Sequence, residues 1–189
     1  SKEDIQRLMC LHKNKIGQEE PAESVSTSAD YPAAFDSRTQ WPDCIHPIRN
    51  QAQCGSCWAF AATEALSDRI CIAGGPNVVL SHQDLVSCYN CNMGCNGGKL
   101  WFAWLGLESR GVTTEECLPY VSGNGTVPTC PSTCADGSAI QRYKCKNNWS
   151  KKGNDIKGAI QTGGPVETGF TVYADFMTYK SGVYHHVSG

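Results

Sequence analysis

Apolar side chains recur at helical spacing in the first strongly patterned segment of the chain, residues 57–70. They form one broad face that no proline or glycine interrupts, and this pattern predicts an α-helix. The face consists of Trp58, Ala61, Ala62, Ala65, Leu66 and Ile70. Further along, Ser81 is followed three positions later by the acidic Asp84, which predicts an N-cap and a short helix to about Cys88.

Two more helices are predicted downstream. Residues 98–109 carry large apolar side chains at helical spacing, and Gly111 is placed to end that helix. Asn154 predicts the cap of a fourth helix that runs through Ile160 and ends at the Gly-Gly-Pro run of residues 163–165.

Residues 166–173 differ from the helical segments, because β-branched and aromatic side chains alternate roughly there and predict a strand. Helices thus come first and strand begins only near the end, which indicates the start of a second, β-rich domain that is not completed. Residues 1–30 are polar and charged and cannot bury enough apolar surface to offset their ordering entropy. They are expected to be a leader or linker, with the folded body starting near Tyr31.

Composition and charge narrow the function classes. The 189 residues are 40% apolar and carry a net charge of −2, from 16 basic and 18 acidic residues. That balance argues against a nucleic-acid partner or a basic membrane-binding face. The apolar runs are far shorter than the roughly 20 residues that a membrane span needs.

The 12 cysteines are unusually many for a reducing compartment and favour disulfides in the secretory pathway. The alternative is a set of zinc knuckles, but no second Cys-x-x-Cys follows at the usual interval, and no metal is expected. Two glycosylation sequons, at Asn124 and Asn148, agree with the secretory interpretation.

Cys57 is the strongest candidate for chemistry. It lies in the first turn of the predicted helix, where unpaired N–H groups and the helix dipole lower the pKa of a thiol. A thioredoxin-like pair with Cys54 would need a preceding strand, yet residues 42–53 are rich in turn formers. A zinc knuckle would need a second pair of ligands that the sequence does not offer. A structural disulfide between Cys54 and Cys57 would leave the thiolate-stabilising position at the helix N-terminus without a role.

The string Cys-Gly-Ser-Cys-Trp at residues 54–58 is the local signature around the catalytic cysteine of papain-like proteases. The chain resembles the cathepsin B branch of that family from about Leu8 to Gly189, and it is more similar to short-loop protist members than to the animal enzymes. The other matching strings cover residues 35–42, 67–71, 94–98, 116–120, 163–166 and 179–184.

The resemblance implies a role for each matching residue. Cys57 would be the nucleophile that forms an acyl-enzyme, and the Gln51 side-chain amide would stabilise the oxyanion together with the Cys57 backbone N–H. Gly97 and Gly98 would form the edge that binds the substrate backbone, although an ordinary turn after a disulfide would look the same. The wall of the pocket for the second residue before the cut would include Leu100 and Gly169.

The resemblance also implies three disulfides: Cys44–Cys71, Cys54–Cys95 and Cys117–Cys134. With Cys57 kept as nucleophile and Cys10 placed in the leader, ten cysteines are enough for five bridges. The other four can pair in three ways, which remain open; they are Cys88, Cys91, Cys130 and Cys145.

Two departures from the family affect the expected activity. The family's catalytic histidine would lie shortly beyond Gly189, and His185 and His186 align with a surface turn, so these residues alone are expected to be inactive. The occluding loop that makes cathepsin B a carboxydipeptidase is shortened to the 12 residues 118–129, none of them histidine. We therefore expect an endopeptidase.

The expected fold is α+β, papain-like and two-lobed, with the helical lobe complete and the β-barrel lobe incomplete. Residues 1–30 would be the C-terminal remnant of an inhibitory propeptide, 31–145 the helical lobe and 146–189 the start of the β-rich lobe. The resemblance implies peptide and protein substrates, propeptide or cystatin-type inhibitors, no cofactor, and a lysosomal, vacuolar or secreted location. The rival hypotheses are an inactive relative that keeps the cleft as a binding module and a disulfide-rich secreted protein without catalytic ancestry.

Overall fold

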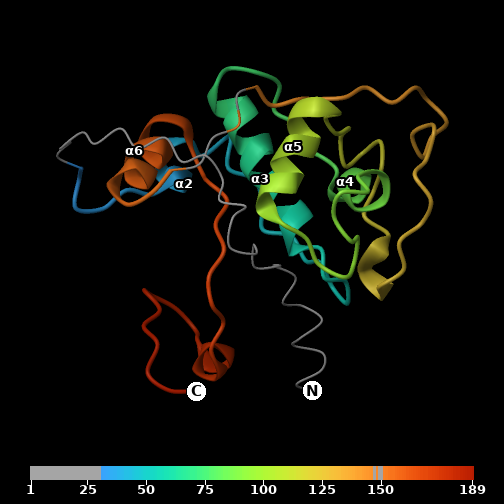
Figure 1. The fold of residues 1–189 in the computed structure, drawn as a ribbon. Coiled ribbons are helices and arrows are strands. Elements are labelled where there is room, and N and C mark those ends of the chain that lie inside the picture. Colours follow the sequence, from blue (N-terminus) through green and yellow to red (C-terminus); the bar gives the residue numbers. More distant parts are fainter. Residues whose placement is uncertain (1–30, 147, 149–150) are drawn as a thin grey trace.

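The computed structural model describes residues 31–146, 148 and 151–189, and the expected leader at residues 1–30 lies outside this part (Figure 1). Helices dominate the described part. The α-helices are α2 (Ser37–Gln40), α3 (Cys57–Ile72), α4 (His82–Cys88), α5 (Leu100–Ser109) and α6 (Asn154–Gly163), and the 3-10 turns are η1 (Ser122–Asn124) and η2 (Ala174–Thr178).

Helix α3 is the centre of the hydrophobic core and packs against both α4 and α5 (Figure 1). The predicted helix is confirmed and runs two residues further than expected, to Ile72. Its buried apolar face meets side chains from the other two helices and from the loops between them. The buried core consists of Trp58, Ala59, Ala62, Leu66, Leu80, Leu85, Val86, Ala103, Leu107 and Val112.

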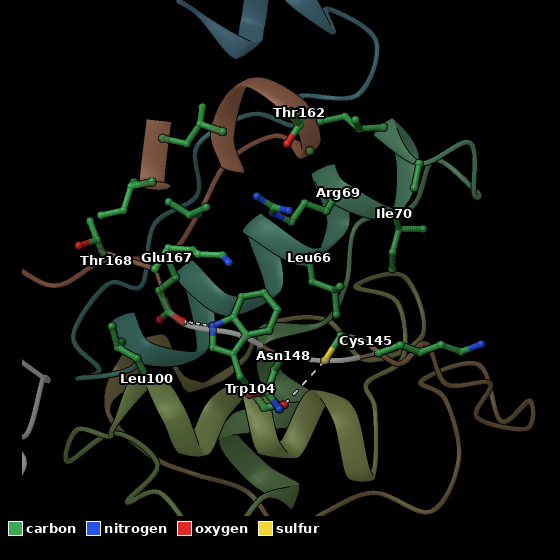
Figure 2. A pocket seen from close by; sticks show the side chains of 18 of the residues that line it. Leu66, Arg69, Ile70, Leu100, Trp104, Cys145, Asn148, Thr162, Glu167 and Thr168 are labelled. Carbon is green, nitrogen blue, oxygen red and sulfur yellow. Dashed lines mark hydrogen bonds between the residues drawn. The ribbon is translucent and has the colours of Figure 1, made fainter. Parts of the chain in front are cut away.

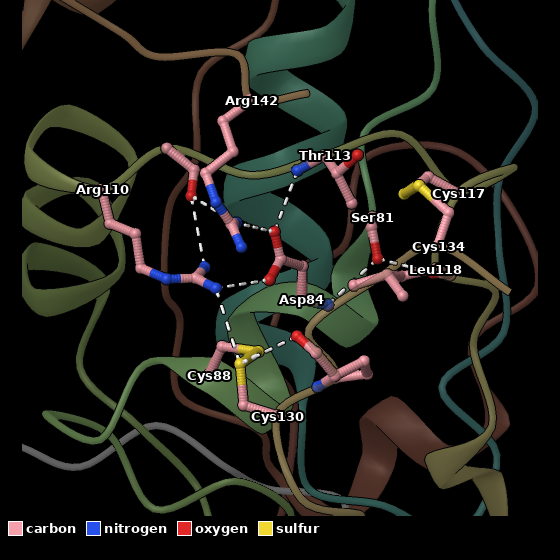
Figure 3. A network of polar contacts seen from close by, with 12 residues as sticks. Ser81, Asp84, Cys88, Arg110, Thr113, Cys117, Leu118, Cys130, Cys134 and Arg142 are labelled. Carbon is pink, nitrogen blue, oxygen red and sulfur yellow. Dashed lines mark hydrogen bonds and ion pairs between the residues drawn. A yellow bond between two sulfur atoms is a disulfide. The ribbon is translucent and has the colours of Figure 1, made fainter. Parts of the chain in front are cut away.

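Helix α4 starts as the sequence predicts, because the Ser81 hydroxyl accepts a hydrogen bond from the Asp84 backbone N–H at 3.0 Å. The same hydroxyl donates to the Leu118 carbonyl at 2.7 Å, so the cap also fixes a distant loop. The Asp84 carboxylate is fully buried and lies between two arginine side chains (Figure 3). It accepts from the Thr113 backbone N–H at 2.9 Å and pairs with Arg110 at 2.9 Å and with Arg142.

The expected cap of α6 is wrong by one residue. The N-cap is Gly153, with φ +56°, and Asn154 is the first residue of the helix. A left-handed φ is cheap only for glycine, so the chain reverses at Gly153 before the helix can start. The predicted end is confirmed, since α6 stops at Gly163 and Gly164 follows with φ +94°.

The predicted strand at residues 166–173 is wrong for this structure. That segment has no regular secondary structure, and only isolated β-bridges occur in the described residues, such as the antiparallel bridge between Val112 and Tyr143. Alternating apolar residues form a strand only where a neighbouring strand accepts their hydrogen bonds. No described segment offers residues 166–173 that neighbour.

The three disulfides implied by the resemblance are present, and their partners are Cys44–Cys71, Cys54–Cys95 and Cys117–Cys134. Of the pairings left open, the structure forms Cys88–Cys130. Cys91 and Cys145 are free thiols, so the expected fifth bridge among these ten cysteines does not form. Cys91 is exposed, whereas Cys145 is half-buried beside α5, where its backbone N–H donates to Leu107.

Candidate active site

The loop before α3 is tied to the glycine-rich loop of residues 94–98. The Cys54–Cys95 disulfide joins the two loops, and Gly55 forms a parallel β-bridge with Asn96. The Gly55 N–H donates to the Cys95 carbonyl at 2.9 Å, and the Gly97 N–H donates to the Gly55 carbonyl at 3.1 Å. The fold therefore brings the predicted nucleophile segment and the predicted substrate-binding glycines together.

Cys57 is the first residue of α3 and is half-buried. Ser56 precedes it as the N-cap and makes no side-chain cap bond, and its carbonyl accepts from Ala59 and Phe60. A thiolate at this position lies at the positive end of the α3 dipole, which favours the ionised form. Cys57 is disulfide-bonded in this structure, and a sulfur in this oxidised form cannot attack a carbonyl.

Gln51 is half-buried six positions before Cys57. Its side-chain amide donates to the Cys54 carbonyl at 2.9 Å, which fixes the side chain against the loop that leads into α3. A primary amide has two N–H groups, and this bond uses one of them.

Gly97 and Gly98 are both buried, and each needs to be glycine for a separate reason. Gly97 has φ +97°, a left-handed conformation that other residues rarely adopt. A Cβ atom at Gly98 would lie 2.5 Å from Cγ of Trp58 and 2.8 Å from Cγ of Asn92. The second glycine is thus required by packing against α3, a reason that the sequence pattern does not reveal.

Leu100 and Gly169 line one cavity of about 800 Å³, bounded by α3, α5, α6 and the segment that follows α6 (Figure 2). On one side the Trp104 indole N–H donates to Oε2 of Glu167 at 2.6 Å. On the other side Arg69 donates to the carbonyls of Ala159, Gly164 and Pro165 and so holds the end of α6 against α3.

The lining of this cavity does not include Cys57, Gln51, Gly97 or Gly98. The two predicted pocket residues thus share one cavity, and the predicted nucleophile is not among the residues that line it. The free Cys145 also lines the cavity, and burial, with a contribution from the Glu108 charge, raises the pKa of its thiol to about 11.

His185 and His186 are exposed on the segment after η2. The His186 ring stacks on Tyr173, with centroids 3.6 Å apart, and its Nδ1 lies 3.3 Å from Oδ1 of Asp175. Asp175 also accepts from the Tyr184 hydroxyl and from two backbone N–H groups. His186 is thus part of a local aromatic and polar cluster around η2.

The two sequons lie in different surroundings. Asn124, in η1, is exposed, and its Oδ1 accepts from the Thr126 N–H at 2.9 Å. Asn148 is half-buried, lines the cavity and donates from Nδ2 to Glu108. Glycosylation at either site remains a prediction.

Neither a group of three or more His, Cys, Asp and Glu side chains suited to a metal ion nor a helix long and apolar enough to cross a membrane occurs in the described residues.

The structure thus places a cysteine at the start of a buried central helix, a fixed glutamine amide in the loop before it, and a glycine-rich edge bonded to that loop. The family model described as "Papain family cysteine protease" matches residues 31–189, and the chain belongs to this family. Within the family, its relatives are cathepsin B and cathepsin B-like proteins.

Cathepsin B of Dictyostelium discoideum is 41% identical over 181 residues, covering 84% of this chain and 57% of the relative. Cathepsin B-like CP2 of Giardia intestinalis is 42% identical over 175 residues, covering 89% of this chain and 58% of the relative. The chain thus spans somewhat more than half the length of these relatives.

Solved structures confirm the papain-like fold. ProCathepsin B S9 from Trypanosoma congolense superposes with a TM-score of 0.90 at 31% identity, covering all of this chain and 69% of that one. A structure from a study of the mite allergens Blo t 1 and Der p 1 matches 87% of this chain with a TM-score of 0.68 at 26% identity.

Proposed function

We propose that the protein is a cathepsin B-like cysteine endopeptidase in which Cys57 is the nucleophile. The observation that carries the proposal is the position of Cys57 as the first residue of α3, beside a glutamine whose amide is fixed at the same loop. In reduced form, its thiolate would attack the carbonyl carbon of a peptide bond and form a tetrahedral oxyanion. Collapse of this adduct breaks the C–N bond, the amine leaves with a proton, and water then hydrolyses the thioester.

The oxyanion would be stabilised by two donors, the second N–H of the Gln51 amide and the backbone N–H of Cys57. Cys57 is the first residue of α3, and the backbone N–H groups in the first turn of a helix point out of its N-terminal end. Each such donor contributes about 2.7 to 4 kcal/mol to transition-state stabilisation in comparable sites. By the family resemblance, the proton for the leaving amine would come from an imidazole beyond Gly189.

We propose the domain division expected from the sequence. Residues 1–30 would be part of an inhibitory propeptide, in keeping with the propeptide of the Trypanosoma congolense neighbour. Residues 31–145 would form the helical lobe, and 146–189 would start the β-rich lobe. The four disulfides support a location in an oxidising compartment, either lysosomal, vacuolar or secreted.

The loop of residues 118–129 supports an endopeptidase rather than a carboxydipeptidase. It is short, contains no histidine, and is held close to the body by Cys117–Cys134 and Cys88–Cys130 at its two ends. We propose that a loop held this way leaves the substrate cleft open to long substrates. Efficient release of C-terminal dipeptides by the full-length protein would contradict this assignment.

The nucleophile is tested by brief iodoacetamide labelling at about pH 5.5 after mild reduction, with the labelled cysteine mapped by peptide mass spectrometry. An ordinary thiol has a pKa of about 8.5 and barely reacts at that pH. We expect fast labelling at Cys57, its loss in Cys57→Ser, and parallel loss of peptide hydrolysis. If Cys57 labels no faster than the exposed Cys91, the site lacks an activated thiolate and the protein is a binding module.

A further inference from the structure

The half-buried Tyr120 carries a hydroxyl that contacts the loop leading into α3. We propose that Tyr120 is a positioning residue that holds the oxyanion-binding glutamine and the start of α3 in their active geometry. This inference rests on the proposed function and adds a residue to its machinery.

The Tyr120 hydroxyl joins the two segments that carry the proposed oxyanion donors. It donates to the Gln51 backbone carbonyl at 2.9 Å and lies 2.9 Å from the hydroxyl of Ser56. Because its one proton is used at Gln51, the Ser56 hydroxyl must donate to it. Ser56 is fully buried and is the N-cap residue immediately before Cys57. A directed chain of hydrogen bonds therefore runs from the N-cap of α3 to the backbone of Gln51.

The segment that follows Gln51 has a strained backbone. Ala52 has φ +51°, and it is the only residue other than glycine with a positive φ in the described part of the chain. Such a conformation costs about 1–3 kcal/mol and persists only where surrounding contacts hold it. The Tyr120 bond to Gln51 is one of these contacts, and the bond from Gln53 N–H to the Gly123 carbonyl at 2.8 Å is another.

Tyr120 is itself held from two sides, so its hydroxyl has a defined position. Its backbone N–H donates to Oε1 of Glu115 at 2.9 Å. Its ring packs edge-on against Phe60 of α3, with centroids 4.8 Å apart. Burial raises the pKa of the Tyr120 phenol, so it stays protonated and remains a donor at any pH where the protease would work.

The chemical consequence concerns the oxyanion and not the thiolate. Loss of the hydroxyl would let the segment from Gln51 to Cys54 relax from its strained form, and the Gln51 amide would shift relative to Cys57. Removal of one oxyanion donor lowers kcat by about 10²–10³-fold, and a donor displaced by less than a bond length should cause only part of that loss. Ionisation of Cys57 depends on the α3 N-terminus, which the ring contact with Phe60 would still support.

The test is Tyr120→Phe in the full-length protein under mild reduction. We expect kcat for a peptide substrate to fall about tenfold with KM within about twofold, because the loss is confined to the transition state. Affinity for a peptide aldehyde, whose adduct carries an oxyanion, should fall by a similar factor. The rate of Cys57 alkylation by iodoacetamide, which forms no oxyanion, should stay within about twofold of wild type.

Three further variants separate positioning of the site from a general effect of losing a hydroxyl. Ser56→Ala should reproduce the loss of kcat, and the double variant should be little worse than either single one, because both break the same chain. Tyr179→Phe removes a hydroxyl that donates to the Gly182 carbonyl near η2, and it should leave all three measurements unchanged.

Two patterns of result would overturn the inference, and they differ from failure of the proposed function. Wild-type kcat in both Tyr120→Phe and Ser56→Ala would show that the hydroxyl chain does not position the site. If Tyr120→Phe lowers the rate of Cys57 alkylation as much as it lowers aldehyde affinity, and also lowers the melting temperature, the role of Tyr120 is purely structural. Slow alkylation of Cys57 in the wild-type protein would instead overturn the proposed function itself.

Discussion

The Oγ1 atom of Thr63 lies 2.5 Å from Nδ1 of His82 in the core between α3 and α4. The Thr63 hydroxyl already donates to the Ala59 carbonyl at 2.8 Å, so Nδ1 of His82 must carry the proton and donate to Thr63. The other ring nitrogen, Nε2, is buried and has no hydrogen-bond partner in the described part of the chain. His82 is therefore held in the neutral tautomer that carries its proton on Nδ1.

We expect His82 to make the fold less stable in acid. Burial, with a contribution from the Arg49 charge, lowers the pKa of His82 to about 3. The unfolded chain takes up a proton near pH 6.5 and the folded one does not, so stability is complete above pH 6.5 and falls as the pH drops from 6.5 towards 3. The decrease in unfolding free energy at pH 5 should be about 2 kcal/mol.

Denaturant titrations from pH 4 to pH 8 measure this slope. In His82→Phe the ring can still stack on Phe60 and no proton can bind, so the slope should flatten. His185→Gln changes an exposed histidine and should leave the pH dependence of stability as in the wild type. A wild-type slope in His82→Phe would assign the acid sensitivity to other groups.

The carboxylate of Asp84 should be one of the most important groups for stability. It is fully buried, whereas Arg110 and Arg142 are about a quarter exposed. Asp84→Ala leaves two guanidinium groups and the Thr113 N–H without their shared acceptor, and we expect a loss of about 3–5 kcal/mol in unfolding free energy.

Chemical denaturation compares Asp84→Ala with Asp36→Ala. Asp36 also pairs with an arginine, Arg38, but that pair is on the surface, where water replaces it readily. The loss for Asp36→Ala should be much smaller. Equal losses would mean that burial does not decide the contribution of these ion pairs.

The two free thiols should differ in reactivity. Cys91 is exposed, whereas the Cys145 thiol is half-buried and its pKa is raised to about 11. At pH 8, in the native protein without reductant, we expect iodoacetamide to label Cys91 within minutes and Cys145 only after unfolding. Mass mapping of a non-reducing digest should also recover the Cys88–Cys130 pair, and a Cys91–Cys145 pair there would contradict the structure.

Gly98→Ala should destabilise the fold by overpacking. The added methyl group would meet Trp58 and Asn92 at 2.5 and 2.8 Å, and forced contacts of this kind cost about 1–3 kcal/mol. Gly137→Ala is the matched control, because nothing lies within 4 Å of its Cβ and only its φ of +83° opposes the change. A smaller loss of unfolding free energy in Gly98→Ala than in Gly137→Ala would contradict the crowding argument.

Local patterns predicted the local structure well. The apolar face of residues 57–70 and the Ser81 cap gave α3 and α4, because helix periodicity and capping act over a few residues. The strand at 166–173 was wrong since a strand depends on a partner elsewhere in the chain. The cap of α6 was missed by one residue because a glycine with positive φ outweighed the side-chain preference of Asn154.

The candidate site could be predicted only in part. The signature around Cys57 identified the helix start, and the family resemblance supplied Gln51, Gly97 and three disulfides. The contacts of the Tyr120 hydroxyl and of Asp84 were not predicted, because their partners are distant in sequence. Gln51 is 69 residues from Tyr120, and Arg142 is 58 residues from Asp84. No periodicity or spacing encodes such contacts.

All four described disulfides join residues between Cys44 and Cys134, and Cys145 is a free thiol. Everything after Cys134 is therefore linked to the helical core by the backbone and by non-covalent contacts. Beyond Asn154 these contacts include the hydrogen bonds from Arg69 to Pro165 and from Trp104 to Glu167. A single backbone cut between Cys145 and Asn154 would convert the molecule into a two-piece assembly. The pieces would migrate together in a native gel and separate in detergent, even without a reducing agent.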